Sequence, residues 1–276
     1  RMAALGHRPI CQDTGVANVF LKVGMGVRID SPRALQDIVD DAVRAGYAAD
    51  ENPLRASMVH DPIFDRRNTG DNAPAIVHVR LVAGDRIDVD VSAKGGGSEN
   101  KAKFTVLDPG ENVADWVVRT VETLGAGWCP PGILGIGAGG GAETAMILAK
   151  ESLNEPLDMA DLLARGPATK AEEMRIEIYE RVNALGIGAQ GLGGLQSVLD
   201  VKLKTFSAHA ASLPVALIPN CAATRHVHFS LDGSGPAQFT PPDLTDWPDL
   251  ADDPAAILRR VDLDDLSADS VRDCKV

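Results

Sequence analysis

Three cysteines spread along the chain constrain its fold more than any other feature. Cys11, Cys129 and Cys221 are far apart, and each lies in a turn-like context: ICQDTG, GWCPPGILGIGAGGG and SLPVALIPNCAATRH. Local zinc knuckles take their ligands from closely spaced cysteine pairs, so this spacing disfavours a knuckle. A metal centre with these three ligands requires a large folded domain that brings three loops together.

Three thiolate ligands also indicate the kind of metal centre. Iron–sulfur clusters usually have four cysteine ligands, so a cubane held by three leaves one iron open. An open iron can act as a Lewis acid toward a substrate oxygen, and we expect the chemistry there. The alternative for any single cysteine is a small buried hydrophobic residue. Cys274 lies in a polar tail without a neighbouring glycine loop, and we interpret it as an incidental thiol.

Composition excludes several classes of protein. The chain has 276 residues, 45% of them hydrophobic, which suffices for a core in one large or two modest domains. A formal net charge of −12 disfavours a nucleic-acid partner. There is no apolar run of membrane-spanning length and no signal-like start, so we expect no membrane association and a cytoplasmic or organelle-matrix location. Four scattered cysteines do not indicate a disulfide framework.

Local patterns predict a mixture of helices and strands. Apolar residues at helical spacing after a Ser-Pro start predict a helix over 31–50. Residues 75–93 alternate apolar and polar on both sides of Ala-Gly-Asp, which predicts an antiparallel β-hairpin. We therefore expect an α/β fold, a mixed sheet with antiparallel hairpins packed by helices, without internal repeats. Further helices are expected over 111–124, 142–152 and 169–185, and extended segments over 201–206 and 226–231.

Two alternative ligand sites remain open at this point. The segment GILGIGAGGGAETAMILAK reads as a strand, a glycine loop and a helix, as in dinucleotide-binding sites, although its glycine spacing departs from G-x-G-x-x-G. Glycines there also let a backbone approach a ligand closely. His226 and His228 alternate in RHVHFSL and could form a zinc site with Cys221, although a second close ligand pair is missing.

Five blocks of the sequence together resemble the iron–sulfur-dependent class I fumarases and their tartrate dehydratase relatives. The resemblance runs in the same order through roughly residues 7–235 and implies a 4Fe-4S cluster held by Cys11, Cys129 and Cys221. The blocks are CQDTG at 11–15, KGGGSENK at 94–101, GWCPPGILGIGAGGGAETAM at 127–146, GIGAQGLGGL at 186–195 and the stretch from His209 to Cys221.

The resemblance implies roles for polar residues near the first cysteine. Gln12 and Asp13 match a pair that contacts the substrate, and Asp13 would take part in proton transfer. The alternative for Asp13 is a turn residue in Asp-Thr-Gly. Arg55 matches an arginine that binds a substrate carboxylate with two parallel hydrogen bonds, the alternative being a surface ion pair.

Two more roles follow from the later blocks. Gly96 and Gly97 match a loop whose backbone closes on the substrate, and the alternative is an ordinary hairpin turn. His209 stands twelve residues before Cys221, as does a substrate-contacting histidine of the family, which makes it a catalytic candidate. The alternative is a structural or solvent-exposed imidazole.

The implied activity is that of a hydro-lyase, which reversibly hydrates fumarate to (S)-malate. The activities of tartrate dehydratase and mesaconate hydratase remain alternatives. Their substrates differ by one methyl or hydroxyl group, and a few contacts in the pocket determine which of them is accepted. A non-catalytic iron–sulfur sensor or scaffold is the alternative from another class. The glycine-rich, substrate-like pocket counts against it.

The chain divides into two parts by composition. Residues 1–235 would form the cluster-binding catalytic domain, of which we expect an N-terminal part to be missing. Residues 236–276 are rich in proline and aspartate and read as a linker toward an absent C-terminal domain. The expected partners are a small dicarboxylate, that second domain or a separate beta subunit, and a second copy of the chain in a homodimer.

Overall fold

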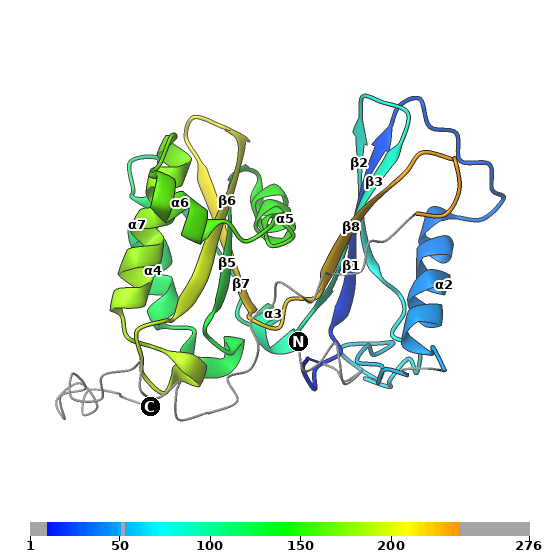
Figure 1. The fold of residues 1–276 in the computed structure, drawn as a ribbon, viewed down its shortest axis with the longest axis horizontal. Coiled ribbons are helices and arrows are strands. Elements are labelled where there is room, and N and C mark those ends of the chain that lie inside the picture. The colour runs from blue at the N-terminus through cyan, green and yellow to red at the C-terminus, as the bar shows by residue number, and fades with distance from the viewer. Residues whose placement is uncertain (1–9, 51–52, 238–276) are drawn as a thin grey trace. The chain divides into compact units, whose positions relative to one another are not determined.

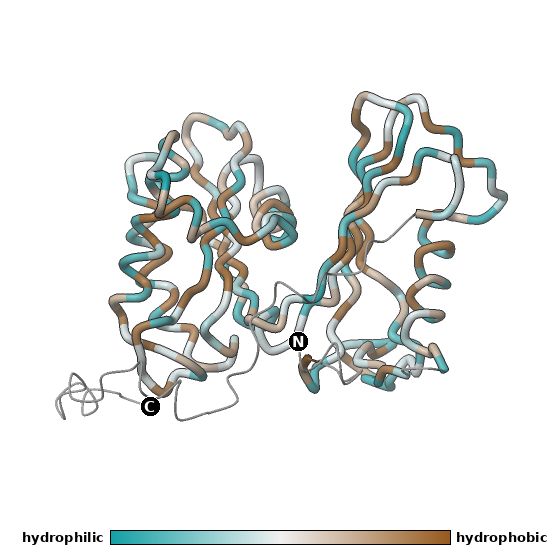
Figure 2. The backbone as a smooth tube through the Cα atoms, in the orientation of Figure 1, coloured by the Kyte–Doolittle hydropathy of each residue, from teal (hydrophilic) through white to brown (hydrophobic). Residues whose placement is uncertain are grey.

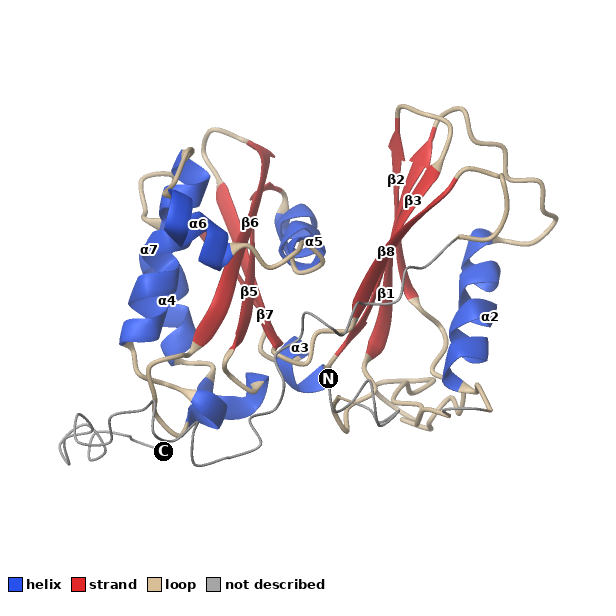
Figure 3. Ribbon diagram, in the orientation of Figure 1, coloured by secondary structure: helices blue, strands red, loops and turns tan. Residues whose placement is uncertain are grey.

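The computed structural model describes residues 10–50 and 53–237 (Figure 1). Two four-stranded sheets form, in the strand orders β2-β1-β3-β8 and β4-β7-β5-β6 (Figure 3). Each contains parallel and antiparallel pairs, so the predicted α/β fold with mixed sheets packed by helices is confirmed. Almost all of the predicted linker, as well as Cys274, lies outside the described residues. In the described part of the chain, no helix is long and apolar enough to cross a membrane.

The first sheet, which we call the β1 sheet, is built around its most buried strand. The strand β1 pairs in parallel with β2 and antiparallel with β3, and β8 pairs with the outer edge of β3. One helix, α2, connects β1 to β2. The bounds are β1 Val16–Gly24, α2 Leu35–Tyr47, β2 Ile76–Val82, β3 Ile87–Lys94 and β8 His226–Leu231.

The predicted hairpin over 75–93 is correct in its strands and wrong in their pairing. β2 and β3 form, but β1 lies between them. β1 is almost continuously buried, so its backbone groups need a hydrogen-bonded neighbour on each side. The β2–β3 connection closes over the end of β1, where Gly24 N–H donates to Arg86 O (2.9 Å) and Gly26 N–H to Gly84 O (2.8 Å).

The helix predicted over 31–50 is present but begins at Leu35. Ser31 Oγ accepts a hydrogen bond from Arg33 N–H (3.1 Å), which holds a local turn in front of the helix. Along α2 the backbone alternates between hydrophobic and hydrophilic segments (Figure 2), as expected for an amphipathic helix. Its buried Asp40 accepts a hydrogen bond from Ala75 N–H (2.8 Å), which ties α2 to the chain entering β2.

The second sheet, the β5 sheet, has helices on both faces. α5 covers one face, and α4, α6 and α7 cover the other (Figure 1). The helices predicted over 111–124, 142–152 and 169–185 are confirmed as α4, α5 and α7. The bounds are β4 Lys103–Leu107, α4 Val113–Glu122, β5 Gly132–Gly140, α5 Ala142–Ser152, α6 Met159–Arg165, α7 Lys170–Ala184, β6 Val198–Ala208 and β7 Leu213–Cys221.

The glycines of GILGIGAGGG serve helix packing. They lie mainly inside strand β5 instead of in a loop, and Gly135 and Gly137 face α5. A Cβ atom on Gly135 would lie 2.2 Å from Ala149 O, and one on Gly137 would lie 2.0 Å from Ala145 O. Only glycine lets the α5 backbone lie this close to the sheet. The spacing that imitates a dinucleotide-binding motif is thus explained by contact between a strand and a helix.

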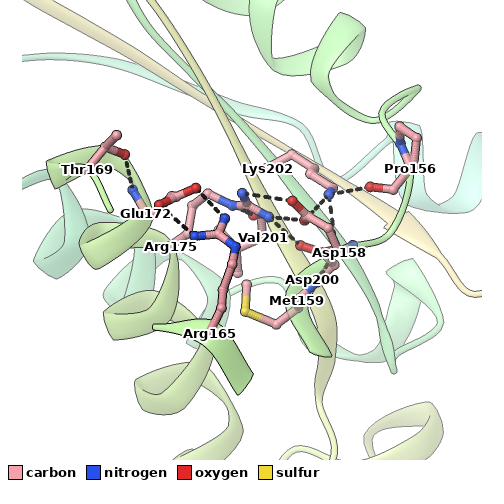
Figure 4. Close-up of polar contacts among 10 residues, drawn as sticks. All are labelled: Pro156, Asp158, Met159, Arg165, Thr169, Glu172, Arg175, Asp200, Val201 and Lys202. Carbon is pink, nitrogen blue, oxygen red and sulfur yellow. Dashed lines mark hydrogen bonds and ion pairs between the residues drawn. The ribbon is translucent and has the colours of Figure 1, made fainter. Parts of the chain in front are cut away.

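A buried ion network fastens the helical layer to β6 (Figure 4). Lys202 Nζ lies 2.6 Å from Asp158 Oδ1 and 3.1 Å from Asp200 Oδ2, and Arg175 of α7 pairs with the same two carboxylates. Asp200 and Lys202 are almost fully buried. Two positive and two negative charges balance, so the network is structural.

The two sheets share one order of connections. Each has a central strand, a helical crossover to a parallel neighbour, and then an antiparallel neighbour on the other side. The next strand in the chain leaves for the other sheet: β4 follows β3 but pairs with β7, while β8 follows β7 but pairs with β3. The sequence suggested no repeat, but the topology contains two similar units that exchange their last strands.

Candidate active site

The first cysteine block forms a tight turn in front of β1. Asp13 Oδ1 accepts a hydrogen bond from Gly15 N–H (2.9 Å), the turn geometry that the sequence offered as an alternative. Asp13 Oδ2 accepts a second bond from Gly96 N–H (2.6 Å), which belongs to the KGGGSENK block. The carboxylate therefore joins two blocks that are distant in the sequence.

The second cysteine stands in an unusual backbone conformation. Cys129 has φ 57° and ψ 60°, in the left-handed region, between the short helix η1 (Gly125–Trp128) and β5. For a residue with a Cβ atom this costs about 1–2 kcal/mol, and such residues cluster at functional sites. Partial desolvation raises the pKa of the Cys129 thiol, although the residue is exposed, and the charges of Cys221, Cys11 and Asp13 raise it further. The three site cysteines and Asp13 thus share one electrostatic environment.

Strand pairing places the third cysteine. Cys221 is the last residue of β7 and pairs with Gly132, the first residue of β5, so it lies near the Cys129 turn. All three site cysteines are free thiols. In residues 10–50 and 53–237, no three His, Cys, Asp or Glu side chains are close enough to hold a single metal ion. These residues therefore contain no group that matches the zinc alternative, and His228 Nδ1 bonds to Asp90 Oδ1 (2.8 Å).

The glycine block begins a short helix. Gly96 and Gly97 open α3 (Gly96–Glu99), and the chain continues into β4 of the other sheet, so the hairpin-turn alternative is wrong. A Cβ atom on Gly97 would lie 3.1 Å from Gly127 O, next to the Cys129 turn. The block therefore contacts both the Cys11 turn, through Asp13, and the Cys129 turn.

The exposed Arg55 lies against the first block. Its Nη2 donates to Gln12 O (3.0 Å), and its backbone oxygen accepts a hydrogen bond from Thr14 Oγ1. Arg55 forms no ion pair among the described residues. The alternative of a surface ion pair is therefore not observed in this part of the structure. The side chain of Gln12 is also exposed, and Cys11 Sγ lies 3.4 Å from Gln12 Oε1.

Two further residues join the blocks and were missed from the sequence. Gln190, with φ 56°, donates its backbone N–H to Pro130 O (2.7 Å), so the GIGAQGLGGL block packs on the Cys129 turn. Arg225 Nη1 donates to Asp13 O. Its Nε is buried without a hydrogen-bond partner in the described part of the chain. In the sequence, only its charge and its position shortly after Cys221 could have indicated a role for Arg225.

His209 is not brought to the cysteines. It is exposed in the β6–β7 turn, where Nδ1 accepts a hydrogen bond from Ala211 N–H (3.1 Å). Cys221 lies at the other end of the nine-residue strand β7. At about 3.3 Å per residue, β7 alone is about 26 Å long, and His209 lies in the turn beyond its far end.

Comparison with known proteins gives one family and a consistent set of relatives. Residues 1–230 match the family model described as fumarate hydratase (Fumerase). The chain is 35% identical over 223 residues to the putative L(+)-tartrate dehydratase subunit alpha of Methanocaldococcus jannaschii, covering 79% of this chain and 76% of that protein. It is 33% identical over 224 residues to the L(+)-tartrate dehydratase subunit alpha of Escherichia coli K12, covering 79% and 71%.

Proposed function

Because the chain belongs to the fumarate hydratase (Fumerase) family and is a hydro-lyase, we propose that it reversibly hydrates fumarate to (S)-malate. The observation that carries the proposal is that the Gly96–Gly97 block contacts both the Cys11 turn, through Asp13, and the Cys129 turn, with Cys221 paired to the start of β5. Family membership favours this enzyme over the sensor or scaffold alternative. A second candidate is dehydration of L(+)-tartrate, the reaction named for the relatives that cover most of the chain.

The donors fit a 4Fe-4S cluster. Cys11, Cys129 and Cys221 are free thiols from three segments, and their charges act on one another. A cluster in which each thiolate binds a different iron suits three ligands that come from separate segments. When bound, such a cluster supplies an open iron as a Lewis acid toward a substrate hydroxyl.

The chain's own residues would bind the dicarboxylate and move its proton. Arg55 has an exposed guanidinium without a carboxylate partner among the described residues, which suits bidentate binding of one substrate carboxylate. Gln12 lies beside it and offers a side-chain amide. Gly96 and Gly97 bring backbone without side chains next to Asp13 and the Cys129 turn. Asp13 would exchange a proton with the substrate by releasing its bond to Gly96 N–H.

A catalytic role for His209 requires a second copy of the chain. The strand β7, about 26 Å long, lies between the turn that carries His209 and Cys221, which keeps His209 from the cysteines of its own chain. In a homodimer the exposed β6–β7 turn of one copy would enter the site of the other. Mixing an inactive His209→Ala variant with an inactive Cys129→Ser variant should then restore part of the activity, whereas mixtures that stay inactive would contradict this role.

The protein also needs a partner. The names of the matched relatives describe alpha subunits, which implies a beta subunit for those enzymes. We expect this chain to act with a corresponding subunit or with a further domain that completes the substrate site. Activity should therefore be measured in that assembly, whereas cluster binding can be measured on this chain.

The deciding experiment is anaerobic reconstitution, with iron and sulfide counts and visible absorption during titration with fumarate and with L(+)-tartrate. A brown protein with about four irons, perturbed by one of the acids, supports the proposal and selects the substrate. Cys129→Ser should lose the cluster and keep the fold, and Cys274→Ser is the matched control that should retain both. A colourless wild-type protein, or a fully active Cys129→Ser variant, would overturn the proposal.

A further inference from the structure

The repeated topology relates four positions at the site. In the β1 sheet, the first residue of the central strand, Val16, pairs with Lys94, the last residue of β3. In the β5 sheet, the first residue of the central strand, Gly132, pairs with Cys221, the last residue of β7. Lys94 therefore occupies in one unit the place that Cys221 occupies in the other.

The other two cysteines follow the same relation. Cys11 lies in the turn that leads into β1, and Cys129 lies in the turn that leads into β5. After Lys94 and after Cys221 the chain crosses to the opposite sheet, and each crossing contributes a residue bonded to Asp13, Gly96 in one and Arg225 in the other. Of four topologically related positions, three are cysteines and one is a lysine.

The surroundings of Lys94 are unusual for an ammonium group. The residue is 5% exposed, and Nζ donates to Ser98 Oγ (2.7 Å) and lies 3.7 Å from Glu99 Oε2. Lys150 pairs with the same carboxylate. Two ammonium groups thus share one carboxylate, although buried charges are normally balanced one for one.

Lys94 lies beside the site. It lines one small cavity with Asn220, the residue before Cys221, and with Arg225. Burial lowers the pKa of Lys94 to about 8, and the negative charges of Glu99 and Cys221 act in the opposite direction. Through Ser98, whose Oγ donates to Gly95 O (3.2 Å), the ammonium also holds the turn that carries Gly96 and Gly97.

We propose that Lys94 is a positioning residue of the active site, whose buried ammonium compensates the negative charge gathered at Cys221 and anchors the Gly95–Gly97 turn. The inference rests on the proposed function and adds to it. A thiolate-held cluster and a dicarboxylate both bring negative charge, and a fixed cation stabilises them most where water is excluded. A lysine with only a structural role would neutralise the carboxylate of Glu99 and would not affect the charge at Cys221.

Charge and packing are separated by three variants. Lys94→Met keeps the aliphatic stem and removes the charge, Lys94→Arg restores the charge, and Lys150→Met removes the other cation of Glu99. The measurements are the reduction potential of the reconstituted cluster, the Kd for the dicarboxylate, and amide exchange of residues 95–98 in the metal-free chain.

We expect Lys94→Met to make the cluster harder to reduce, to weaken dicarboxylate binding by about tenfold, and to speed amide exchange in the glycine turn. Lys94→Arg should recover the potential, and Lys150→Met should shift it much less. A folded Lys94→Met variant with a cluster of wild-type reduction potential and wild-type affinity for the dicarboxylate would overturn this inference and leave the proposed function intact. A wild-type protein without a cluster would instead overturn the proposed function, and this inference with it.

Discussion

The β1 sheet and the β5 sheet share their connections and differ in how they are covered. In the β5 sheet, β7 is buried along nearly its whole length and helices pack on both faces. In the β1 sheet, β2 is largely exposed, with Leu81 at 66%, and a cavity of about 500 Å³ lies between α2 and the apolar face of the strands. Within residues 10–50 and 53–237, the same topology therefore gives a densely packed unit and a loosely covered one.

The difference matters for the candidate site, because its residues come from both units. Cys129 and Cys221 are set by the ends of β5 and β7 in the dense unit, whereas Cys11 and Asp13 lead into the loosely covered one. We expect stability to be concentrated in the β5 sheet. Changes there should affect the whole molecule, and changes in the β1 sheet should be milder.

Gly137→Ala should have the largest effect. A Cβ atom 2.0 Å from Ala145 O would force α5 away from β5, and we expect a loss of at least about 4 kcal/mol of unfolding free energy. Urea unfolding followed by circular dichroism measures it. A loss below about 1 kcal/mol would show that α5 is not closely packed and would remove the contrast between the sheets.

Asp200→Asn should come next. The change leaves Lys202 and Arg175 with a single carboxylate, Asp158, in the buried network (Figure 4). We expect a loss of about 3 kcal/mol, because uncompensated buried charge is costly. The matched control is Asp88→Asn in β3, whose partner Arg86 is exposed, and in the same urea titration it should change the unfolding free energy by less than about 1 kcal/mol.

A pair of leucine truncations compares the two units directly. Leu217 in β7 is fully buried, whereas Leu21 in β1 lines the cavity beside α2. Leu217→Ala should cost about 3–4 kcal/mol and Leu21→Ala about 2 kcal/mol, since a side chain beside a cavity loses fewer contacts. Equal losses in parallel urea titrations would contradict the difference in packing.

Acid should weaken the β5 sheet through Asp158. Burial would raise the pKa of this carboxyl, but hydrogen bonds from Arg175 and Lys202 outweigh it and lower the pKa to about 2. Its stabilising contribution is therefore complete above about pH 3.8 and is lost as the pH falls through 2. The effect should be about 1 kcal/mol, because the side chain is 42% exposed and screened by solvent.

Thermal unfolding at pH 5, 3.5 and 2 tests this assignment. Asp158→Asn should reduce the acid sensitivity in that range. Part of the acid sensitivity should persist in this variant, because the hydrogen bond with Arg165 also lowers the pKa of Glu172 to about 2. An unchanged acid profile in the Asp158→Asn variant would show that other carboxyls account for the loss.

Gly46→Ala should have the smallest effect and the opposite sign. Gly46 is in α2, and a Cβ atom there would meet nothing within 4 Å. Alanine should stabilise the helix by about 0.5–1 kcal/mol, visible as a higher Tm. A destabilised variant would mean that α2 packs against something beyond the described residues.

The sequence by itself determined the local elements and the main ligand candidates. The spacing of apolar residues located the helices α2, α4 and α7 and the strands β2, β3, β6 and β8, because that spacing is a property of each segment, whereas β1, β4 and β7 were not predicted. The three site cysteines and the glycine blocks could be picked out because their residue types suit thiolate ligation and close backbone approach. The resemblance of those blocks to the Fumerase family was borne out by the family match.

Only the tertiary structure decided which segments meet. β1 separates two strands that read as a hairpin, β4 and β8 exchange sheets, and Asp13 bonds to Gly96 and Arg225. The tertiary structure also places His209 beyond the end of β7 that is far from Cys221, and it places Lys94 opposite the start of β1. The physical reason is that a strand's local pattern states that it must pair and which face is buried, whereas its partner is selected by how all the strands and helices together bury their apolar surface.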